Sequence, residues 1–291
     1  MTTAVTGTVD ESATAVRADG LGKRYGAKWV LRGCAFELPA GRVAALVGAN
    51  GAGKTTLMSV LKGLLNADEG TVRTAGRVAF VAQEKPVYRR FTAAEMLEVG
   101  KRLNLVWDQD RAVRWLERFE IPLTRPCGKL SGGQQAQVAF ALAIGARPTV
   151  LMLDEPLANL DPLARREVTA ELLAEVEETG MTVLLSTHVV AELAGVADYL
   201  LLLAGGRLLA GGDVDELLTR HASYAGPTAD APPVAGAVVQ ARHTGTQSTF
   251  LVELPGGQSR PAVAEPWVQR PVTLEEYVLA QLAVTRKGHG A

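Results

Sequence analysis

Gly48-Ala49-Asn50-Gly51-Ala52-Gly53-Lys54-Thr55 follows the apolar run Val43–Val47 and opens a helical pattern that extends to about Leu64. Glycines let a chain wrap with its N–H groups pointing inward, and the N-terminus of the following helix adds partial positive charge. In such a loop Lys54 reaches the β and γ phosphates, and the Thr55 hydroxyl binds magnesium. The stretch predicts a phosphate loop for a nucleoside triphosphate. Its expected ligand-binding residues are Gly48, Asn50, Gly51, Ala52, Gly53, Lys54, Thr55 and Thr56.

Two adjacent carboxylates end a second apolar run, Val150-Leu151-Met152-Leu153-Asp154-Glu155. At the carboxyl end of a strand, Asp154 can hold magnesium through water, and Glu155 can orient or deprotonate an attacking water. The alternative is a strand that merely ends in solvated charges. We favour the catalytic interpretation because the run directly follows a predicted helix at 134–146.

Three single residues extend the predicted site. Gln83 ends the strand pattern 77–82, where an amide can contact both magnesium and the attacking water. His188 follows the apolar run 182–187, so its imidazole can hydrogen-bond the γ-phosphate. Tyr25 can stack on adenine. Each of them alone is equally explained as a solvated glutamine, a structural histidine or a half-buried tyrosine.

The pentapeptide Leu130-Ser131-Gly132-Gly133-Gln134 lies between the phosphate loop and the acid pair. It precedes an amphipathic helix that carries Val138, Ala141, Leu142 and Gly145 on one face. A free helix N-terminus is thereby offered to an anion.

The order of these segments resembles the ATPase subunit of an ABC transporter from about Val16 to Arg220. The resemblance implies an α/β P-loop cassette with a mostly parallel sheet, an antiparallel β element and a helical subdomain, and it implies ATP and Mg²⁺ as ligands. It also implies that two subunits sandwich two ATP molecules head to tail. Ser131, Gly132, Gly133 and Gln134 would then bind the γ-phosphate held by the second subunit.

The segment Leu157-Ala158-Asn159-Leu160-Asp161-Pro162 matches the loop that crosses this dimer in the family. Asp161 is placed as the N-cap of the next helix and as a member of the nucleotide site, with Pro162 as the first helical residue. Some positions depart from the family's pattern. They are Ala49 in place of proline, Gln137 in place of arginine, and the pair Ala158-Asn159.

Composition bounds the remaining possibilities. The chain has 291 residues, of which 47% are hydrophobic, so a full core can form. With 30 basic and 31 acidic residues it has no charge footprint for nucleic acid. Cys34 and Cys127 lack metal-site spacing and indicate unpaired thiols in a reducing compartment. No run of 18 apolar residues is present, so we expect a cytoplasmic protein bound to the membrane's inner face through a separate permease.

Domain boundaries follow from shifts in pattern. We expect a flexible tail over residues 1–15, a cassette over 16–222, a linker over 223–235, a small βα appendage over 236–285, and a second tail over 286–291. Within the cassette, residues of about 84–148 predict a helical subdomain with helices near 93–103, 109–119 and 134–146.

The appendage combines two alternating runs, Gly236–Arg242 and Thr249–Leu254, with a turn at Gly256-Gly257. Thr273-Leu274-Glu275-Glu276 is a capping-box pattern for a last helix. Its apolar face must rest on the cassette or on a partner. This ending resembles that of bacterial export ATPases, including drug- and antibiotic-resistance types. The face consists of Leu274, Tyr277, Val278 and Leu282.

The sequence therefore predicts an ATPase that drives a separate permease, with export preferred over import. The segment Glu84–Phe91 is the candidate surface for the permease, and a solvated basic loop is the alternative. A soluble ABC ATPase in translation or DNA repair is a further alternative, although the chain shows one cassette and no heptads. A regulator without turnover would lack Glu155 or His188, and both are present.

Overall fold

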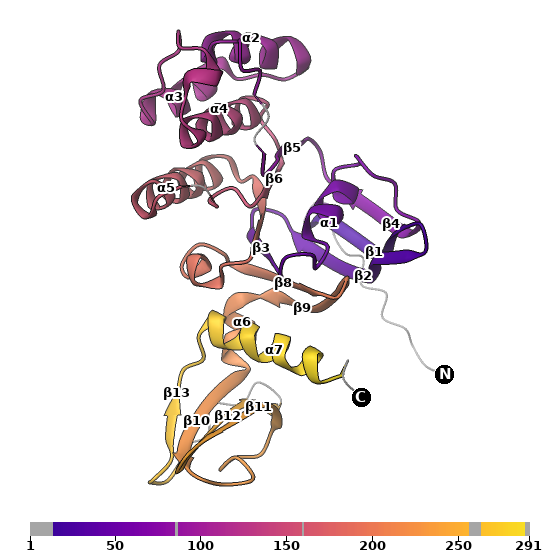
Figure 1. The fold of residues 1–291 in the computed structure, drawn as a ribbon, viewed down its shortest axis with the longest axis vertical. Helices are drawn as coiled ribbons and strands as arrows, with labels where there is room; N and C mark the ends of the chain where they lie inside the picture. Colours follow the sequence, from indigo (N-terminus) through magenta and orange to yellow (C-terminus); the bar gives the residue numbers. More distant parts are fainter. Residues whose placement is uncertain (1–13, 85–86, 159, 256–262, 289–291) are drawn as a thin grey trace, which may run out of the picture.

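The computed structural model describes residues 14–84, 87–158, 160–255 and 263–288. The molecule is elongated (Figure 1). A helical subdomain lies at one end, a central sheet flanked by a smaller sheet lies in the middle, and a C-terminal unit lies at the other end.

The central sheet has the order β5-β6-β7-β3-β8-β9, and all neighbours are parallel except β8 and β9. Val47 pairs with Thr187, and Asp154 pairs with Ser186. The carboxyl ends of the strands that carry the predicted site residues therefore meet at one edge. The strands are β5 (Val78–Val81), β6 (Val150–Asp154), β7 (Thr182–Thr187), β3 (Val43–Val47), β8 (Tyr199–Ala204) and β9 (Arg207–Asp213).

Helices cover both faces of this sheet, so its central strands are buried throughout. In β3, Val43, Ala45 and Val47 belong to one apolar cluster, and Ala44 and Leu46 belong to another. This alternation explains why such strands read as continuous apolar runs. The helices next to the sheet are α1 (Lys54–Leu61), α5 (Pro162–Thr179) and α6 (Val214–Thr219), with the short turn η3 (Val190–Leu193).

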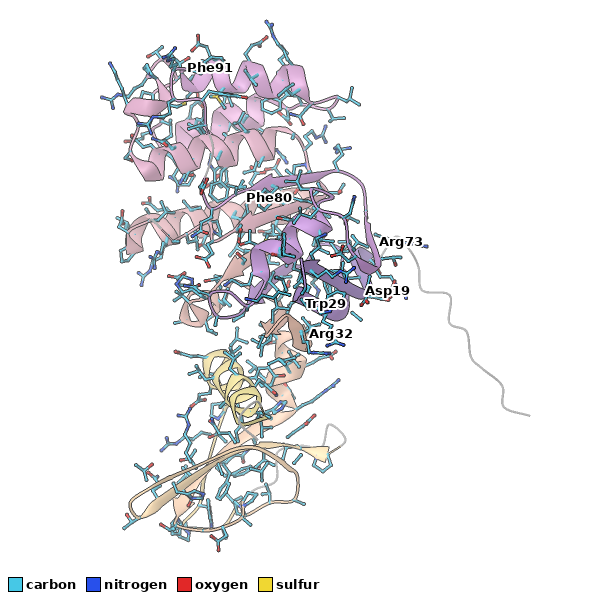
Figure 2. All side chains as sticks on the ribbon, turned by 45° about the vertical axis from the view of Figure 1, so that its right-hand side comes forward. Asp19, Trp29, Arg32, Arg73, Phe80 and Phe91 are labelled. Atoms are coloured by element: carbon cyan, nitrogen blue, oxygen red, sulfur yellow. The ribbon has the colours of Figure 1, made fainter. Side chains whose placement is uncertain are left out.

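The smaller sheet is antiparallel, in the order β2-β1-β4. Figure 2 labels Asp19, Trp29 and Arg73 on it. Thr14 and Ala15 belong to β1 and Ala15 is buried, so the flexible tail predicted over 1–15 is wrong at these two residues, and residues 1–13 lie outside the described residues. The strands are β1 (Thr14–Tyr25), β2 (Lys28–Pro39) and β4 (Glu69–Thr74).

The helical subdomain contains the three predicted helices. Trp115 stacks on Phe140 with ring centroids 5.4 Å apart, and its Nε1 donates to Gln137 Oε1 at 3.0 Å. Gln137 therefore belongs to the subdomain core. The elements are α2 (Ala93–Leu103), α3 (Gln109–Arg118), η2 (Cys127–Lys129) and α4 (Gly132–Gly145).

Both cysteines are buried and unpaired. Burial raises the pKa of the Cys34 thiol and that of the Cys127 thiol. A high thiol pKa disfavours the reactive thiolate. Across the described residues, no helix has the length and apolar character needed to cross a membrane.

The C-terminal unit is a four-stranded antiparallel sheet in the order β11-β12-β10-β13, with helix α7 beside it. The predicted linker over 223–235 is wrong at its start, because residues 223–227 belong to β10, a central strand in which Tyr224 is fully buried. Gly245 and Thr246 join β11 to β12, and the turn predicted at Gly256-Gly257 lies outside the described residues. The elements are β10 (His221–Pro227), β11 (Ala237–Thr244), β12 (Gln247–Glu253), β13 (Val268–Arg270) and α7 (Leu274–Gly288).

Helix α7 lies between the central sheet and the C-terminal sheet (Figure 1). Its predicted capping box is present: the Glu276 amide donates to Thr273 Oγ1 at 3.1 Å, and the Thr273 amide donates to Glu276 Oε2 at 3.0 Å. Tyr277 and Val278 are buried in the same apolar cluster as Leu193 of η3. The apolar face of α7 thus rests on this chain's own cassette.

We expect Tyr277→Ala to lower the unfolding free energy by about 3 kcal/mol, because it opens a cavity at a side chain that is 2% exposed. A thermal melt should show a clear drop in Tm. Leu279→Ala is the matched control, since Leu279 is 46% exposed on the same helix. Equal melting temperatures for the two variants would contradict the docking of α7.

Candidate functional site

The phosphate loop connects β3 to α1, and two of its glycines are required by geometry. A Cβ atom at Gly48 would overlap the Leu203 carbonyl oxygen of β8. Gly53, the N-cap of α1, has φ of 107°, a left-handed conformation that favours glycine. Within the loop, the Ala52 amide donates to the Ala49 carbonyl at 3.0 Å. The loop is therefore fixed by the sheet beneath it.

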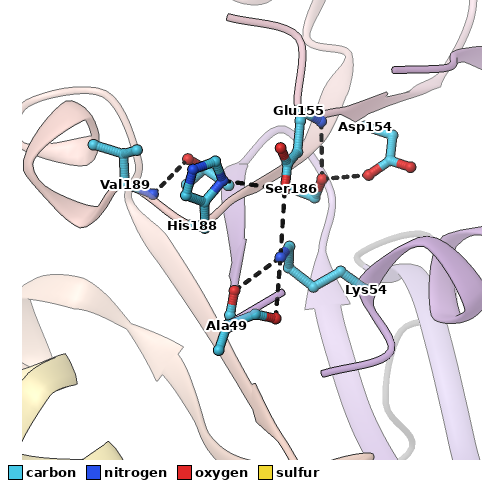
Figure 3. Close-up of polar contacts among 9 residues, drawn as sticks. Ala49, Lys54, Asp154, Glu155, Ser186, His188 and Val189 are labelled. Carbon is cyan, nitrogen blue, oxygen red and sulfur yellow. Dashed lines mark hydrogen bonds and ion pairs between the residues drawn. The ribbon is translucent and has the colours of Figure 1, made fainter. Parts of the chain in front are cut away.

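Lys54 begins α1, and its side chain is nearly buried. Its Nζ donates to the Gly48 carbonyl at 2.8 Å and lies 3.5 Å from Glu155 Oε1 (Figure 3). The ammonium group thus sits between the phosphate loop and the acid pair. A γ-phosphate bound by the loop would meet this positive charge directly.

Ser186, a residue that the sequence analysis missed, holds the acid pair. Its Oγ donates to Asp154 Oδ1 at 2.6 Å and accepts from the Glu155 amide at 2.9 Å. Asp154 is 2% exposed, so this hydrogen bond compensates for the loss of water around its carboxylate. Only the pairing of β6 with β7 reveals the role of Ser186, and no sequence motif signals it.

Glu155 and His188 point toward one another (Figure 3). His188 Nδ1 lies 3.2 Å from Glu155 Oε1. Glu155 has φ of 45°, a left-handed conformation that costs a non-glycine residue on the order of 1–3 kcal/mol. Such a conformation persists where the surrounding structure imposes it. Here the Glu155 carboxylate contacts both Lys54 and His188.

A cavity of about 420 Å³ unites six of the eight predicted residues of the phosphate loop with Gln83 and Glu155, whereas Gly48, Ala52, Asp154 and His188 do not line it. Gln83 lies in the turn after β5 and is exposed. Val30 of β2 also lines the cavity and was missed, because an ordinary apolar strand residue carries no signal of a site. The lining residues are Val30, Asn50, Gly51, Gly53, Lys54, Thr55, Thr56, Gln83 and Glu155.

The remaining predicted residues do not line this cavity within the described part of the chain. Tyr25 ends β1 and is half exposed. Ser131 caps α4 through two reciprocal hydrogen bonds with Gln134. The Gln134 amide donates to Ser131 Oγ at 3.2 Å, and the Ser131 amide donates to Gln134 Oε1 at 3.1 Å. Ser131 and Gly132 are exposed at the N-terminus of α4 in the helical subdomain.

Asp161 occupies its predicted N-cap position. Its carboxylate accepts from the amides of Leu163 and Ala164, each at 3.0 Å, and Pro162 is the first residue of α5. The adjacent Asn159 lies outside the described residues.

Lys62 is a second lysine that interacts electrostatically with Asp154. Burial lowers the pKa of this lysine, and the charge of Asp154 opposes that shift. Its Nζ lies 3.0 Å from the ring centroid of Phe80 in β5, a cation–π contact.

A parallel sheet whose strand ends carry a phosphate loop, a buried aspartate and an adjacent glutamate defines a P-loop nucleotide hydrolase. The family model described as "ABC transporter" matches residues 31–158. The chain is 36% identical over 217 residues to the "Aliphatic sulfonates import ATP-binding protein SsuB" of Corynebacterium glutamicum, which covers 72% of this chain and 89% of that protein. The chain belongs to the ATP-binding subunits of ABC transporters.

Two further comparisons agree. The chain is 34% identical over 221 residues to the "Daunorubicin resistance ATP-binding protein DrrA3" of Streptomyces coeruleorubidus, covering 70% of each. A solved structure described as "Structure of ATP binding subunit of ABC transporter" has a TM-score of 0.65 at 25% identity and covers 70% of this chain and 92% of that one. The predicted family, the cassette fold and the ATPase activity are confirmed. The relatives include an import protein and a resistance protein, so they do not decide the direction of transport.

Proposed function

We propose that two copies of this chain close head to tail around two ATP molecules and power a separate permease for export. The observation that carries the dimer is the position of Ser131. It is exposed at the N-terminus of α4 on the helical subdomain, and within the described residues no member of 131–134 lines the cavity at the phosphate loop. We infer that residues 131–134 act at the phosphate loop of another subunit.

The contacts within the cavity support a division of roles. Lys54 and the loop amides bind the β and γ phosphates. Thr55 and Gln83 line the cavity, and Asp154 lies buried at the end of β6 beside Glu155. Thr55 and Asp154 supply oxygen donors of the kind that Mg²⁺ prefers. When bound, Mg²⁺ would neutralise charge that develops on the phosphates.

Glu155 is the proposed general base. A water oxygen attacks the γ-phosphorus, the bond from that phosphorus to the bridging oxygen breaks, and ADP leaves with the bond's electron pair. The proton of the water passes to the Glu155 carboxylate, and the Lys54 ammonium stabilises the charge on the phosphates. We propose that His188 donates a hydrogen bond to the γ-phosphate, and its contact with Glu155, at 3.2 Å from Nδ1 to Oε1, supports this role.

The proposed permease surface lies between β5 and α2. Tyr88 and Phe91 expose 64% and 39% of their surface, and their ring centroids are 5.3 Å apart. Figure 2 labels Phe91 on the helical subdomain, far from Trp29 and Arg32. The segment exposes aromatic side chains beside Arg89 and Arg90. Aromatic residues and arginine are enriched at protein interfaces, so this composition favours a contact surface for a partner helix over a solvated basic loop. Lys85 and Pro86 lie outside the described residues.

The proposal of export rests on the C-terminal ending, which resembles that of export ATPases, and on the similarity to a daunorubicin resistance protein. Import is the alternative, because SsuB is an import protein. Inside-out vesicles that carry the chain with its permease separate the two. Accumulation of substrate inside on addition of ATP indicates export, and loss of preloaded substrate indicates import.

We expect the Glu155→Gln protein to be monomeric without nucleotide and dimeric with ATP, because a dimer that cannot hydrolyse ATP stays closed. Sedimentation with and without ATP measures this change. Adding Ser131→Arg should prevent dimerisation and leave ATP binding to the monomer intact, since Ser131 lies away from its own phosphate loop. Ala170→Arg, at an exposed position on α5, is the control and should still dimerise. An unchanged monomer mass at saturating ATP would refute the sandwich.

A further inference from the structure

Arg165 joins the segment after Glu155 to the segment after His188. It lies in the first turns of α5. Its Nε donates to the carbonyl of Leu157 at 3.1 Å and to that of Leu160 at 2.9 Å. Its Nη1 forms an ion pair with Glu192 Oε1.

The turn that carries Glu192 is a short 3-10 helix of four residues. Glu192 lies in η3, four residues after His188, and η3 has no side-chain cap. The Glu192 amide donates to the Val189 carbonyl at a long 3.4 Å. The Leu193 carbonyl accepts from the amides of Val196 and Ala197 at 3.0 and 3.1 Å. Side-chain contacts add to these bonds, because Leu193 is buried and Val190 packs in the apolar cluster that includes the buried face of α7.

The packing around the two segments is incomplete. They border a cavity of about 90 Å³ whose lining includes Glu155, Leu157, Arg165, His188 and Glu192. A void of this size removes contacts that would otherwise resist displacement. The ion pair is partly buried, with 33% of the Arg165 side chain and 21% of the Glu192 side chain exposed, so solvent screens it less than a surface pair.

We propose that Arg165 and Glu192 are positioning residues for ATP hydrolysis, and that they hold His188 in register with Glu155. The inference rests on the roles proposed above for Glu155 and His188. The planar guanidinium suits this task because it reaches three acceptors in a fixed geometry, whereas the ammonium of a lysine is a single point charge. The pair itself contacts neither the phosphate loop nor the cavity at the nucleotide.

Arg165→Met should lower kcat about 10- to 100-fold, the size of effect expected when a catalytic group is displaced by about 1 Å. The ATP affinity and the KM for ATP should stay within about twofold, because no phosphate-binding residue is changed. Arg165→Lys should recover part of the lost kcat. Arg166→Met is the matched control: it removes an exposed arginine from the next position on α5 and should leave kcat unchanged.

A double-mutant cycle with His188→Ala tests the route of the effect. If Arg165 acts through His188, then adding Arg165→Met to His188→Ala should cause no further loss of kcat. An equal loss in both backgrounds would overturn the inference, as would a loss of ATP-dependent dimerisation when Arg165→Met is added to Glu155→Gln. Should Arg165→Met fail to fold, Glu192→Gln enters the same cycle with the same expectations.

The outcome can be separated from that of the proposed function. If Glu155→Gln and His188→Ala impair hydrolysis but Arg165→Met does not, only the positioning role fails. If Glu155→Gln hydrolyses ATP at the parent rate, the assignment of the base fails first, whatever Arg165→Met does.

Discussion

Lys54→Ala should bind ATP at least about 100-fold more weakly than the parent and should show almost no turnover. The substitution removes charge-assisted hydrogen bonds to two phosphates, each worth about 1.5–3 kcal/mol. It also removes the cation 3.5 Å from Glu155 Oε1, which leaves that carboxylate facing the triphosphate without a counter-charge. A binding titration with a slowly hydrolysed ATP analogue measures the first effect, and phosphate release measures the second.

Lys101→Ala is the control for that titration, because Lys101 is an exposed lysine of α2 that is remote from the cavity. It should bind ATP as the parent does. If Lys54→Ala bound ATP with near-parent affinity, the assignment of residues 48–55 as the phosphate loop would be wrong. The thermal melt of both variants must be compared, since Lys54 also donates to the Gly48 carbonyl.

Glu155→Gln should retain ATP binding and hydrolyse ATP about 10²–10⁴-fold more slowly, the range for a positioned general base. The amide keeps the volume of the side chain and still offers an oxygen to His188 Nδ1, but it cannot take the proton of the attacking water. Single-turnover hydrolysis measures the step without the contribution of product release.

Glu167→Gln is the control for this substitution, since Glu167 is an exposed carboxylate on α5. Its rate should equal that of the parent. A rate in Glu155→Gln that matches the control would show that another group accepts the proton, and Glu155 would then be left with an electrostatic role only.

Local patterns predicted most of the fold. The helix Ala93–Leu103 was predicted at its observed bounds, and the Thr92 side chain forms a complete capping box with Glu95. The buried strands were legible because both faces of the central sheet are covered, which leaves continuous apolar runs. The start of the C-terminal unit was missed, because Ala225-Gly226-Pro227 has the composition of a linker. Pairing with β12 and β13 makes it a strand, and this information lies outside the segment.

The candidate site shows the same limit. Lys54 and Glu155 were found by motif and Gln83 by its position at a strand end, and the structure brings them to one cavity. Ser186 was missed because its importance arises from register, opposite Asp154 in the neighbouring strand. Arg165 was missed because its acceptors are two backbone carbonyls and a glutamate 27 residues away. Tertiary contacts create such roles, and one-dimensional spacing does not record them.

The position of α7 between the two sheets means that part of the cassette is synthesised well before the helix that covers it. Its buried face covers η3, yet at about 5–20 residues per second the ribosome needs roughly 4–17 s to add the ~85 residues from His188 to Leu274. During that interval Leu193 and its apolar neighbours have no cover from α7. The nascent cassette therefore exposes an apolar surface at η3, close to His188. Chaperones that bind apolar segments can act on this surface until α7 has been synthesised.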